Sequence, residues 1–225
     1  MFLDSSHFTR RSSLCHHATP YLTSVVSTAS AAEQAWVCPA GWLVCPHSQF
    51  TGRVILHILF VCTGNICRSP TAERLAAAYA ADLNIADFRA SSAGTRAVRD
   101  HPIHHNAAQV IQELGGETSN FSARQLTPRI ASDADIVLTM TTAHRDAVLE
   151  LAPHRLHRTF TLIEAARIAS ECDPQTVYDL AAFRAHVPSH ESSDVPDPIG
   201  QDPEFFASVG AQIATLLPPI LNLCR

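Results

Sequence analysis

Apolar side chains recur along the chain with two different periods. Residues 53–61, RVILHILFV, carry β-branched and other apolar residues on both faces, which is typical of a strand buried inside a parallel sheet. In residues 70–84, which follow closely, Ala72, Ala76 and Tyr79 recur at the spacing of one helix face. The first ordered segment is therefore expected to be a strand that leads into a helix.

This alternation continues to the end of the chain. Further strands are predicted at 88–94, 133–140 and 158–163, and further helices at 106–116, 141–153, 164–170 and 202–217. We expect Ser69 to cap the first helix, with Pro70 at its first position, and Pro218-Pro219 to end the last one. Strands that alternate with helices predict an α/β fold, a four-stranded parallel sheet flanked by helices.

Two segments lack either period. Residues 1–52 are rich in Ser, Thr and His, and we interpret them as a disordered extension or as translation from a start codon placed too early, with the folded domain spanning 53–225. A secretion signal after Arg10-Arg11 is the alternative, although His16 and His17 make the following stretch too polar for one. Residues 171–200 are predicted to form a long polar loop, which is usually functional or disordered.

Composition narrows the class of protein. All 16 basic residues are Arg, and the net charge of −5 implies no general affinity for nucleic acid or for an anionic membrane, so any anion site must be local. The 7 cysteines are odd in number and irregular in spacing, which indicates a reducing, cytoplasmic compartment with free thiols. No stretch approaches about 18 uninterrupted apolar residues, so no membrane span is expected.

The stretch FVCTGNICRSP, residues 60–70, carries the clearest chemistry. A strand enters a turn at Gly64-Asn65, and the turn enters a helix. Successive backbone N–H groups in such a loop point inward and form an anion site that the helix dipole reinforces. Arg68 adds a planar set of donors that matches two phosphate oxygens. The loop is therefore predicted to hold a tetrahedral oxyanion.

Cys62 lies where the strand becomes the loop, so its sulfur is expected to face the anion site. The same donors favour its thiolate form, and a thiolate beneath a bound phosphate can attack phosphorus in line. Ser69 can donate a hydrogen bond to that sulfur. The departing ester oxygen then needs a proton, so a carboxylic acid must come from elsewhere in the chain.

Three other interpretations of the two cysteines are weaker. A zinc site needs several soft ligands, and no His or Cys pair with ligand spacing accompanies Cys62 and Cys67. The inferred compartment disfavours a structural disulfide, and packing alone would not explain Arg68 or the Gly-Asn turn. C-x5-R by itself arises often by chance, whereas C-x-G-N-x-C-R-S-P between a buried strand and a helix is specific.

The stretch VCTGNICRSPTAE closely resembles the low-molecular-weight protein tyrosine phosphatases. The resemblance extends through SSAGT (91–95), SARQLT (122–127), ADIVLTM and DPIG in the order of that family, and spans roughly residues 55–224. It implies a four-stranded parallel sheet, a cysteinyl-phosphate intermediate, and no metal or other cofactor. It also implies a phosphorylated protein as the partner and a monomer or weak dimer.

The resemblance assigns roles residue by residue. Cys62 would be the nucleophile and Arg68 the phosphate clamp, while Asn65 would hold the loop in its strained shape with help from Ser92. Ser69 would stabilise the thiolate. The phosphate-binding loop implied in this way comprises Thr63, Gly64, Asn65, Ile66, Cys67 and Ser69. Cys67 would also form a reversible disulfide with Cys62 under oxidant, which protects a reactive thiolate from further oxidation.

Three Asp-Pro pairs compete for the role of general acid. The order of the family's motifs favours Asp197, with Asp194 as the alternative. Asp202 is expected to cap the last helix, with Pro203 at its first position. Asp173 comes too early, at the start of the long loop.

The sequence departs from the family pattern at several positions. Ile199 and Gly200 stand where tyrosine-specific members often carry aromatic residues, and Phe121 replaces a family histidine, so Asn65 could be held differently. Ile66 resembles the tyrosine-specific type, because relatives that hydrolyse phosphoarginine carry Thr there. His144, and the histidines of residues 101–105, are interpreted as surface groups.

The leading hypothesis is a phosphomonoester hydrolase, a protein tyrosine phosphatase. Protein arginine phosphatase and arsenate reductase activities remain alternatives that would use the same loop. A thioredoxin-coupled reductase would need two closely spaced cysteines downstream, and only Cys172 and Cys224 follow. A catalytically inactive phosphoryl-binding module is disfavoured by the presence of Cys62, Arg68 and Asp197.

Overall fold

A computed structural model describes residues 55–186 and 194–225 of the chain. The predicted disorder of residues 1–52, and the alternative of a secretion signal, concern residues outside that description. Residues 53 and 54, the expected start of the first strand, also lie outside it.

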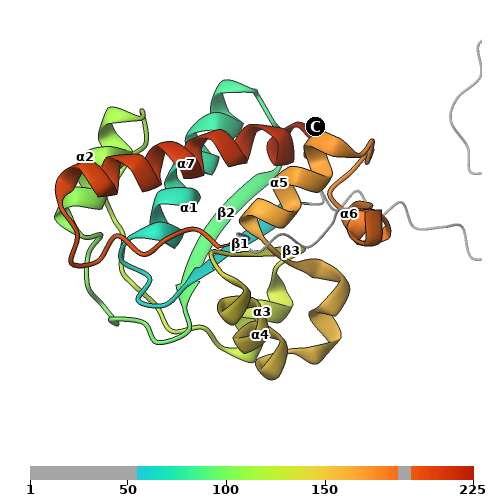
Figure 1. Ribbon diagram of the computed structural model, residues 1–225, viewed down its shortest axis with the longest axis horizontal. Helices are drawn as coiled ribbons and strands as arrows, with labels where there is room; N and C mark the ends of the chain where they lie inside the picture. Colours follow the sequence, from blue (N-terminus) through green and yellow to red (C-terminus); the bar gives the residue numbers. More distant parts are fainter. Residues whose placement is uncertain (1–54, 187–193) are drawn as a thin grey trace, which may run out of the picture. The chain divides into compact units, whose positions relative to one another are not determined.

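Four parallel strands form one sheet (Figure 1). They are β1 (Leu56–Cys62), β2 (Phe88–Gly94), β3 (Ile136–Thr139) and β4 (Thr159–Thr161), in the order β2-β1-β3-β4. The predicted four-stranded parallel sheet is confirmed. From β1 the chain passes to β2 on one side, and it then crosses to β3 on the other side of β1. In open parallel sheets, ligands bind at the carboxyl ends of the strands where the strand order reverses in this way. Cys62, the last residue of β1, lies there.

Helices cover both faces of the sheet (Figure 1). One layer contains α1 (Arg68–Asp82), α2 (His105–Glu113), α5 (Leu162–Glu171) and α7 (Pro203–Asn222), and the other contains α3 (Pro128–Asp133) and α4 (Thr142–Leu151). Three short helical turns complete the described chain: η1 (Pro153–Arg158), α6 (Leu180–Phe183) and η2 (Arg184–His186). The arrangement has three layers, helix, sheet and helix.

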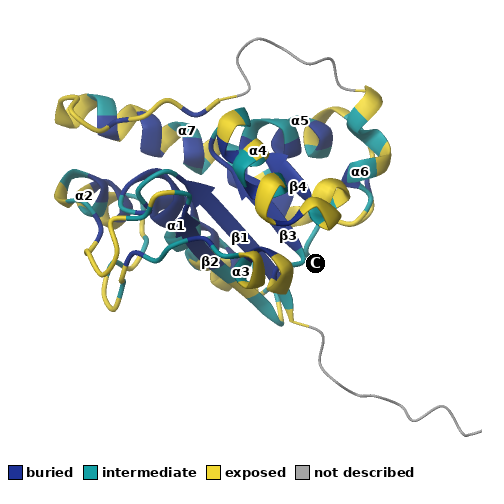
Figure 2. Cartoon of the chain, turned by 90° about the horizontal axis from the view of Figure 1, so that it is seen from below, coloured by how far each residue is buried: buried dark blue, intermediate teal, exposed yellow. Residues whose placement is uncertain are grey.

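Alternate residues of β1 pack into different cores. Ile58 and Phe60 join the cluster formed with α1, α5 and α7, whereas Leu59 and Val61 join the cluster formed with α3 and α4. All four side chains are fully buried, and Figure 2 shows most of β1 and all of β3 as buried. This explains the continuous apolar run, because a strand with helices on both faces has no solvent face.

Three expectations about element ends were wrong. α1 begins at Arg68, so Ser69 lies inside the helix and its hydroxyl makes no capping bond. α7 continues through Pro218 and Pro219 to Asn222. The described part of the loop 171–200 contains α6 and η2, which were not predicted, and neither was α3. The expected capping of α7 by Asp202, with Pro203 at its first position, is confirmed.

The last two turns of α7 show why the proline signal failed. Leu217, Ile220 and Leu221 are fully buried in the main core. Burying one such side chain contributes about 2 kcal/mol, so the three together offset the two interior prolines, each of which costs roughly 3 kcal/mol. Tertiary packing therefore extends the helix past its local stop signal.

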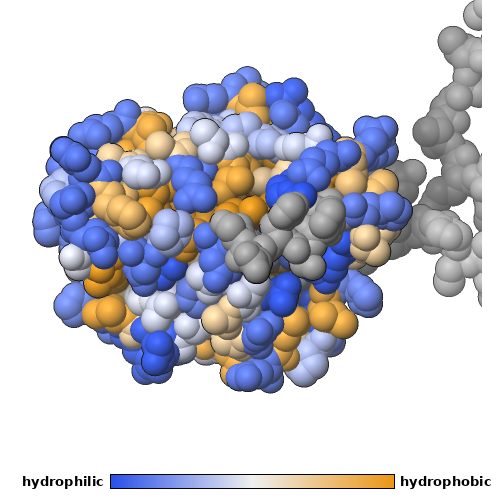
Figure 3. Space-filling view, viewed as in Figure 1, coloured by the Kyte–Doolittle hydropathy of each residue, from blue (hydrophilic) through white to orange (hydrophobic). Residues whose placement is uncertain are grey.

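By length and composition alone, α7 could cross a membrane. Its apolar side chains instead contribute to the core, where the helix packs against α1, α2 and α5. In Figure 3 the face of the molecule that carries α7 is a mosaic of hydrophilic and hydrophobic residues. We therefore interpret α7 as a core helix.

Candidate active site

The Cys62 thiol lies at the carboxyl end of β1 and is only 3% exposed. Its Sγ atom is 2.9 Å from the Ser69 hydroxyl oxygen and accepts a hydrogen bond from the Asn65 backbone N–H at 3.3 Å. The predicted contact between Ser69 and Cys62 is therefore present. Donors that surround a sulfur in this way stabilise negative charge on it.

Asn65 ties this loop together from a left-handed conformation with φ of +56°. Its Nδ2 group donates to the Ser69 hydroxyl at 3.0 Å and to the Ser92 hydroxyl at 2.8 Å, and its Oδ1 accepts from the Arg124 backbone N–H at 2.9 Å. A positive φ is unfavourable for a non-glycine residue and persists where its surroundings support it. Because Ser69 accepts from Asn65, its own proton is available for the sulfur of Cys62.

Two residues in this network were not anticipated. The Ser92 hydroxyl donates to a Glu73 carboxylate oxygen at 2.5 Å, and the Arg124 Nε donates to the Ser92 carbonyl at 2.7 Å. Phe121, which replaces a family histidine, lies beneath the Arg74 guanidinium with 5.5 Å between the guanidinium carbon and the ring centroid. Glu73 falls within PTAE and Arg124 within SARQLT, so the motifs contained both residues without indicating their contacts.

The chain that follows β2 also holds the loop in place. The backbone N–H groups of Thr95, Arg96 and Val98 donate to loop carbonyls, each at 2.9 Å. A Cβ atom on Gly94 would lie 2.5 Å from the carbonyl oxygen of Thr63, so only glycine permits this approach. The SSAGT motif thus holds the loop from its second side.

Arg68 joins the loop to the segment before α7. Its side chain is 5% exposed, and its guanidinium donates to the Val195 carbonyl at 3.0 Å and to a carboxylate oxygen of Asp197 at 2.5 Å. The carboxylate of Asp197 is itself half exposed. The structure therefore brings Cys62, Arg68 and Asp197 into one site from distant parts of the sequence.

The other candidate carboxylates have different positions. An Asp194 oxygen accepts from the Thr142 backbone N–H at 2.7 Å, at the start of α4. Asp202 accepts from the Phe205 N–H at the start of α7, and Asp173 is exposed after α5. Of these four aspartates, all within the described part of the chain, only Asp197 forms an ion pair with Arg68.

The expectation that His144 is a surface group was wrong. This residue is 7% exposed, and its two ring nitrogens lie 2.8 Å from the hydroxyl oxygens of Thr63 and Thr141. Burial, reinforced by the positive charge of Arg68, lowers the pKa of His144 to about 4, so the ring is neutral at neutral pH. Sequence reasoning missed it because one of its two partners, Thr63, comes from a loop 81 positions away. His101 and His105 are exposed, as expected, whereas His104 is partly buried and stacks on Phe206.

An open cleft of about 520 Å³ lies beside the loop. Most of the residues that line it have polar side chains, among them Thr63, Arg68, Arg96, His144 and Asp194. Ile66 and Val98 are not part of this lining. They lie next to Gly64 in the loop region, and Val98 is 39% exposed.

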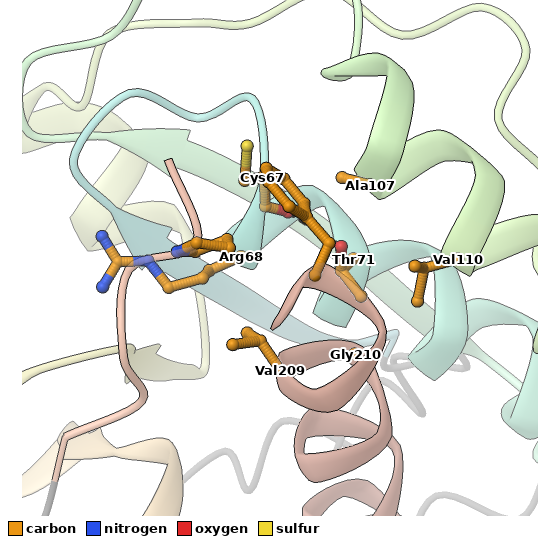
Figure 4. A pocket seen from close by; sticks show the side chains of 9 residues that line it. Cys67, Arg68, Thr71, Ala107, Val110, Val209 and Gly210 are labelled. Carbon is orange, nitrogen blue, oxygen red and sulfur yellow. Dashed lines mark hydrogen bonds between the residues drawn. The ribbon is translucent and has the colours of Figure 1, made fainter. Parts of the chain in front are cut away.

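Cys67 faces the opposite side of the loop. It is 4% exposed and packs with Ile103 and Phe206, and burial, with Cys62 and Asp197 adding to it, raises the pKa of its thiol to about 12. Figure 4 shows Cys67 beside a small cavity between α1, α2 and α7, with the Arg68 guanidinium extending away from Ala107 and Val110. Within 55–186 and 194–225, no group of three or more His, Cys, Asp or Glu side chains could hold a metal ion.

A parallel α/β sheet whose central strand ends in a C-x5-R loop defines a class of proteins that bind oxyanions next to a cysteine. A family model described as low molecular weight phosphotyrosine protein phosphatase matches residues 57–173. The chain therefore belongs to this family, as its motifs indicated.

Known relatives agree with this assignment. The chain is 38% identical over 97 residues to the low molecular weight protein-tyrosine-phosphatase Wzb of Escherichia coli, covering 43% of this chain and 63% of Wzb. It is 30% identical over 160 residues to a protein-arginine-phosphatase of Geobacillus stearothermophilus, covering 71% and 90% of the two chains. The crystal structure of the Erwinia amylovora tyrosine phosphatase AmsI matches with a TM-score of 0.59 at 26% identity, covering 78% and 98%.

Proposed function

We propose that this chain hydrolyses phosphomonoesters on proteins, with phosphotyrosine as the substrate, through a phosphate ester of Cys62. The observation that carries the proposal is the environment of the Cys62 sulfur, which receives a backbone N–H and lies within hydrogen-bond distance of the Ser69 hydroxyl. Arg68 follows in the same loop with its guanidinium directed to Asp197. Nucleophile, clamp and acid are thus present together.

In the first step the substrate phosphate binds the N–H groups of loop 63–69 and the Arg68 guanidinium. A phosphate dianion competes with the Asp197 carboxylate for that guanidinium and displaces it. The Cys62 thiolate attacks phosphorus, the S–P bond forms and the bond to the ester oxygen breaks. Asp197 transfers its proton to that oxygen, and the alcohol departs neutral.

In the second step water hydrolyses the cysteinyl phosphate. The Asp197 carboxylate takes a proton from the attacking water, the P–O bond forms and the P–S bond breaks. The sulfur leaves as a thiolate, and the Ser69 hydroxyl and the Asn65 N–H stabilise it. Asp197 is protonated again and inorganic phosphate is released, so the cycle closes without a cofactor.

The substrate preference rests on two apolar side chains beside the catalytic loop. Ile66 and Val98 lie next to Gly64 and offer apolar contact to an aryl ring, which favours phosphotyrosine over the polar guanidinium of phosphoarginine. The exposed Ile199, next to the Asp197-Pro198 pair, can add a further apolar contact. Similarity to an arginine phosphatase keeps phosphoarginine as the second candidate substrate.

We further propose that the enzyme is cytoplasmic and that Cys67 forms a reversible disulfide with Cys62 under oxidant. The raised pKa of Cys67, about 12, makes it a poor nucleophile until it loses its proton, so disulfide closure should be slow at neutral pH. Inactivation by peroxide should be reversed by dithiothreitol in the wild type and become irreversible in Cys67→Ser. Equal recovery of both proteins would exclude the disulfide.

The substrate proposal is tested by turnover of a phosphotyrosine peptide, a phosphoarginine peptide and arsenate. We expect kcat/KM to be highest for phosphotyrosine, and Ile66→Thr to move the ratio toward phosphoarginine. If the wild-type protein prefers phosphoarginine, the proposed substrate is wrong, but the proposed mechanism still holds. Arsenate reduction without phosphatase activity would overturn the proposed function.

A further inference from the structure

A second polar pocket, of about 330 Å³, lies behind the catalytic loop between α1, β2 and the chain before α3. Three arginines line it, Arg74 from α1, Arg89 from β2 and Arg124 from the SARQLT segment. Ser122 adds a hydroxyl group, and Glu73 is the one carboxylate among the lining residues. The formal charge of the lining is therefore positive in a chain whose net charge is −5.

These guanidinium groups have unused donors. The Nε atom of Arg74 is buried and has no hydrogen-bond partner in the described protein, and its nearest carboxylate contact, to Glu73, is 3.8 Å long. Arg124 uses its Nε on the Ser92 carbonyl, and its terminal nitrogens make no hydrogen bond to a described residue. Arg89 is exposed and likewise makes no side-chain hydrogen bond or ion pair to the described residues. A buried donor such as the Arg74 Nε is costly unless a partner satisfies it.

The pKa shifts of the groups around the pocket also indicate an excess of positive charge. Burial is the main cause that lowers the pKa of Arg124 and of His57, and the positive charge of Arg89 contributes to both shifts. Burial also raises the pKa of Glu73, so its negative charge is disfavoured there. The pocket is thus electropositive and poorly neutralised by the protein itself.

We propose that this pocket is a second oxyanion site, which binds inorganic phosphate or the phosphate group of a small metabolite through Arg74, Arg89 and Arg124. Guanidinium groups match the oxygens of a tetrahedral dianion, and Ser122 supplies a neutral donor at the rim. Phosphate is released by the proposed reaction, so the pocket can respond to the product.

The pocket is connected to the catalytic loop through bonds already described. The backbone N–H of Arg124 donates to the side-chain Oδ1 of Asn65, and Glu73 accepts from the Ser92 hydroxyl, which in turn accepts from the Asn65 Nδ2 group. Asn65 also donates to Ser69, which contacts the Cys62 sulfur. An anion that attracts Arg124 therefore acts on the residue that shapes the loop. This coupling, unlike binding itself, rests on the proposed function.

The binding proposal is tested first with tungstate, a heavy tetrahedral dianion, in crystals of the wild-type protein. Anomalous peaks are expected at two places, the catalytic loop and the arginine pocket. Tungstate at the catalytic loop alone would overturn the second site and leave the proposed function intact. Tungstate in the pocket but not at the loop would instead contradict the assignment of the loop as the catalytic phosphate site.

Calorimetric titration with inorganic phosphate tests binding in solution. Arg89→Ala and Arg74→Ala should each weaken the second site about tenfold or more, because a charged hydrogen bond contributes roughly 1.5–3 kcal/mol. Arg68→Ala should remove the catalytic site only. Arg129→Ala is the matched control, since that arginine lies on α3 with a side chain 90% exposed. A single class of sites that Arg68→Ala abolishes would overturn the proposal, as would titrations unchanged by both pocket variants.

Coupling is tested by the pattern of phosphate inhibition. Occupancy of the pocket should lower kcat as well as raise KM in the wild type, and inhibition should become purely competitive in Arg89→Ala. Purely competitive inhibition of the wild type would show that the pocket does not communicate with the loop. Thermal melting of each variant checks that folding is retained, and Arg74→Ala serves if Arg89→Ala is unstable.

Discussion

The two sides of the active site are held in different ways. Most of loop 62–69 is buried, and its side chains are bonded to one another and to β2, α1 and the SARQLT segment. The segment 194–200 is largely exposed, and Arg68 contacts it at Val195 and Asp197. The buried side carries the proposed nucleophile, and a nucleophile must be placed accurately before any substrate arrives. The exposed side carries the proposed acid, which in that mechanism leaves Arg68 when phosphate binds.

The largest expected effect is on the buried side. Cys62→Ser removes the thiolate, and turnover of p-nitrophenyl phosphate should fall by roughly 10⁴-fold or more. Cys172→Ser, in a partly buried position outside the site, should retain activity. Wild-type turnover in the Cys62→Ser protein would rule out the cysteinyl-phosphate route.

The exposed side is tested by the acid. Asp197→Asn should lower kcat for an alkyl or aryl phosphate by about 10²- to 10⁴-fold, the range for loss of a general acid. Asp194→Asn, whose carboxylate bonds the start of α4, should change kcat little. A larger loss in Asp194→Asn than in Asp197→Asn would transfer the role of acid to Asp194.

Two substitutions of Asn65 distinguish the contribution of its backbone conformation to stability from that of its side-chain hydrogen bonds. Asn65→Ala loses three side-chain hydrogen bonds, and it keeps a left-handed backbone with φ of +56° without a side chain suited to it. Asn65→Gly loses the same bonds without that strain. We expect Asn65→Ala to be less stable than Asn65→Gly by about 1–2 kcal/mol in urea unfolding. Equal stability of the two variants would mean that the strain is relieved elsewhere.

A pH titration examines the wall of the cleft at His144. Its pKa is about 4 in the folded protein, against 6.5 for an ordinary histidine. Between these values the unfolded chain binds a proton that the folded chain does not, so stability should fall as pH drops from 6.5 to 4, and level off below. The loss is about 3 kcal/mol at most. The His144→Gln variant should lack this part of the pH-dependent loss of stability, whereas the part that comes from His57 is the same in the variant and the wild type. Identical stability profiles of the variant and the wild type would contradict a lowered pKa of His144.

The α/β order, the four strands and the nature of the loop were predictable because each depends on local pattern. A continuous apolar run predicted a strand covered on both faces, and C-x-G-N-x-C-R-S-P between strand and helix predicted an anion loop. The end of α7 was not predictable locally, since the burial of Leu217, Ile220 and Leu221 offsets the cost of two prolines. His144 was missed for a similar reason, because its environment is made by Thr63 in a distant loop.

The sequence by itself predicted the proposed nucleophile, its clamp and the succession of strands and helices along the chain, because these lie within a few residues of one another or follow from hydrophobic periodicity. Only the tertiary structure decided which carboxylate meets Arg68, since Asp197 lies 129 positions away. It also decided that Glu73 and Arg124 brace Asn65 and that three arginines share one pocket. Contacts of this kind depend on how the strands and helices pack against each other, and the short-range spacing of residues does not carry that information.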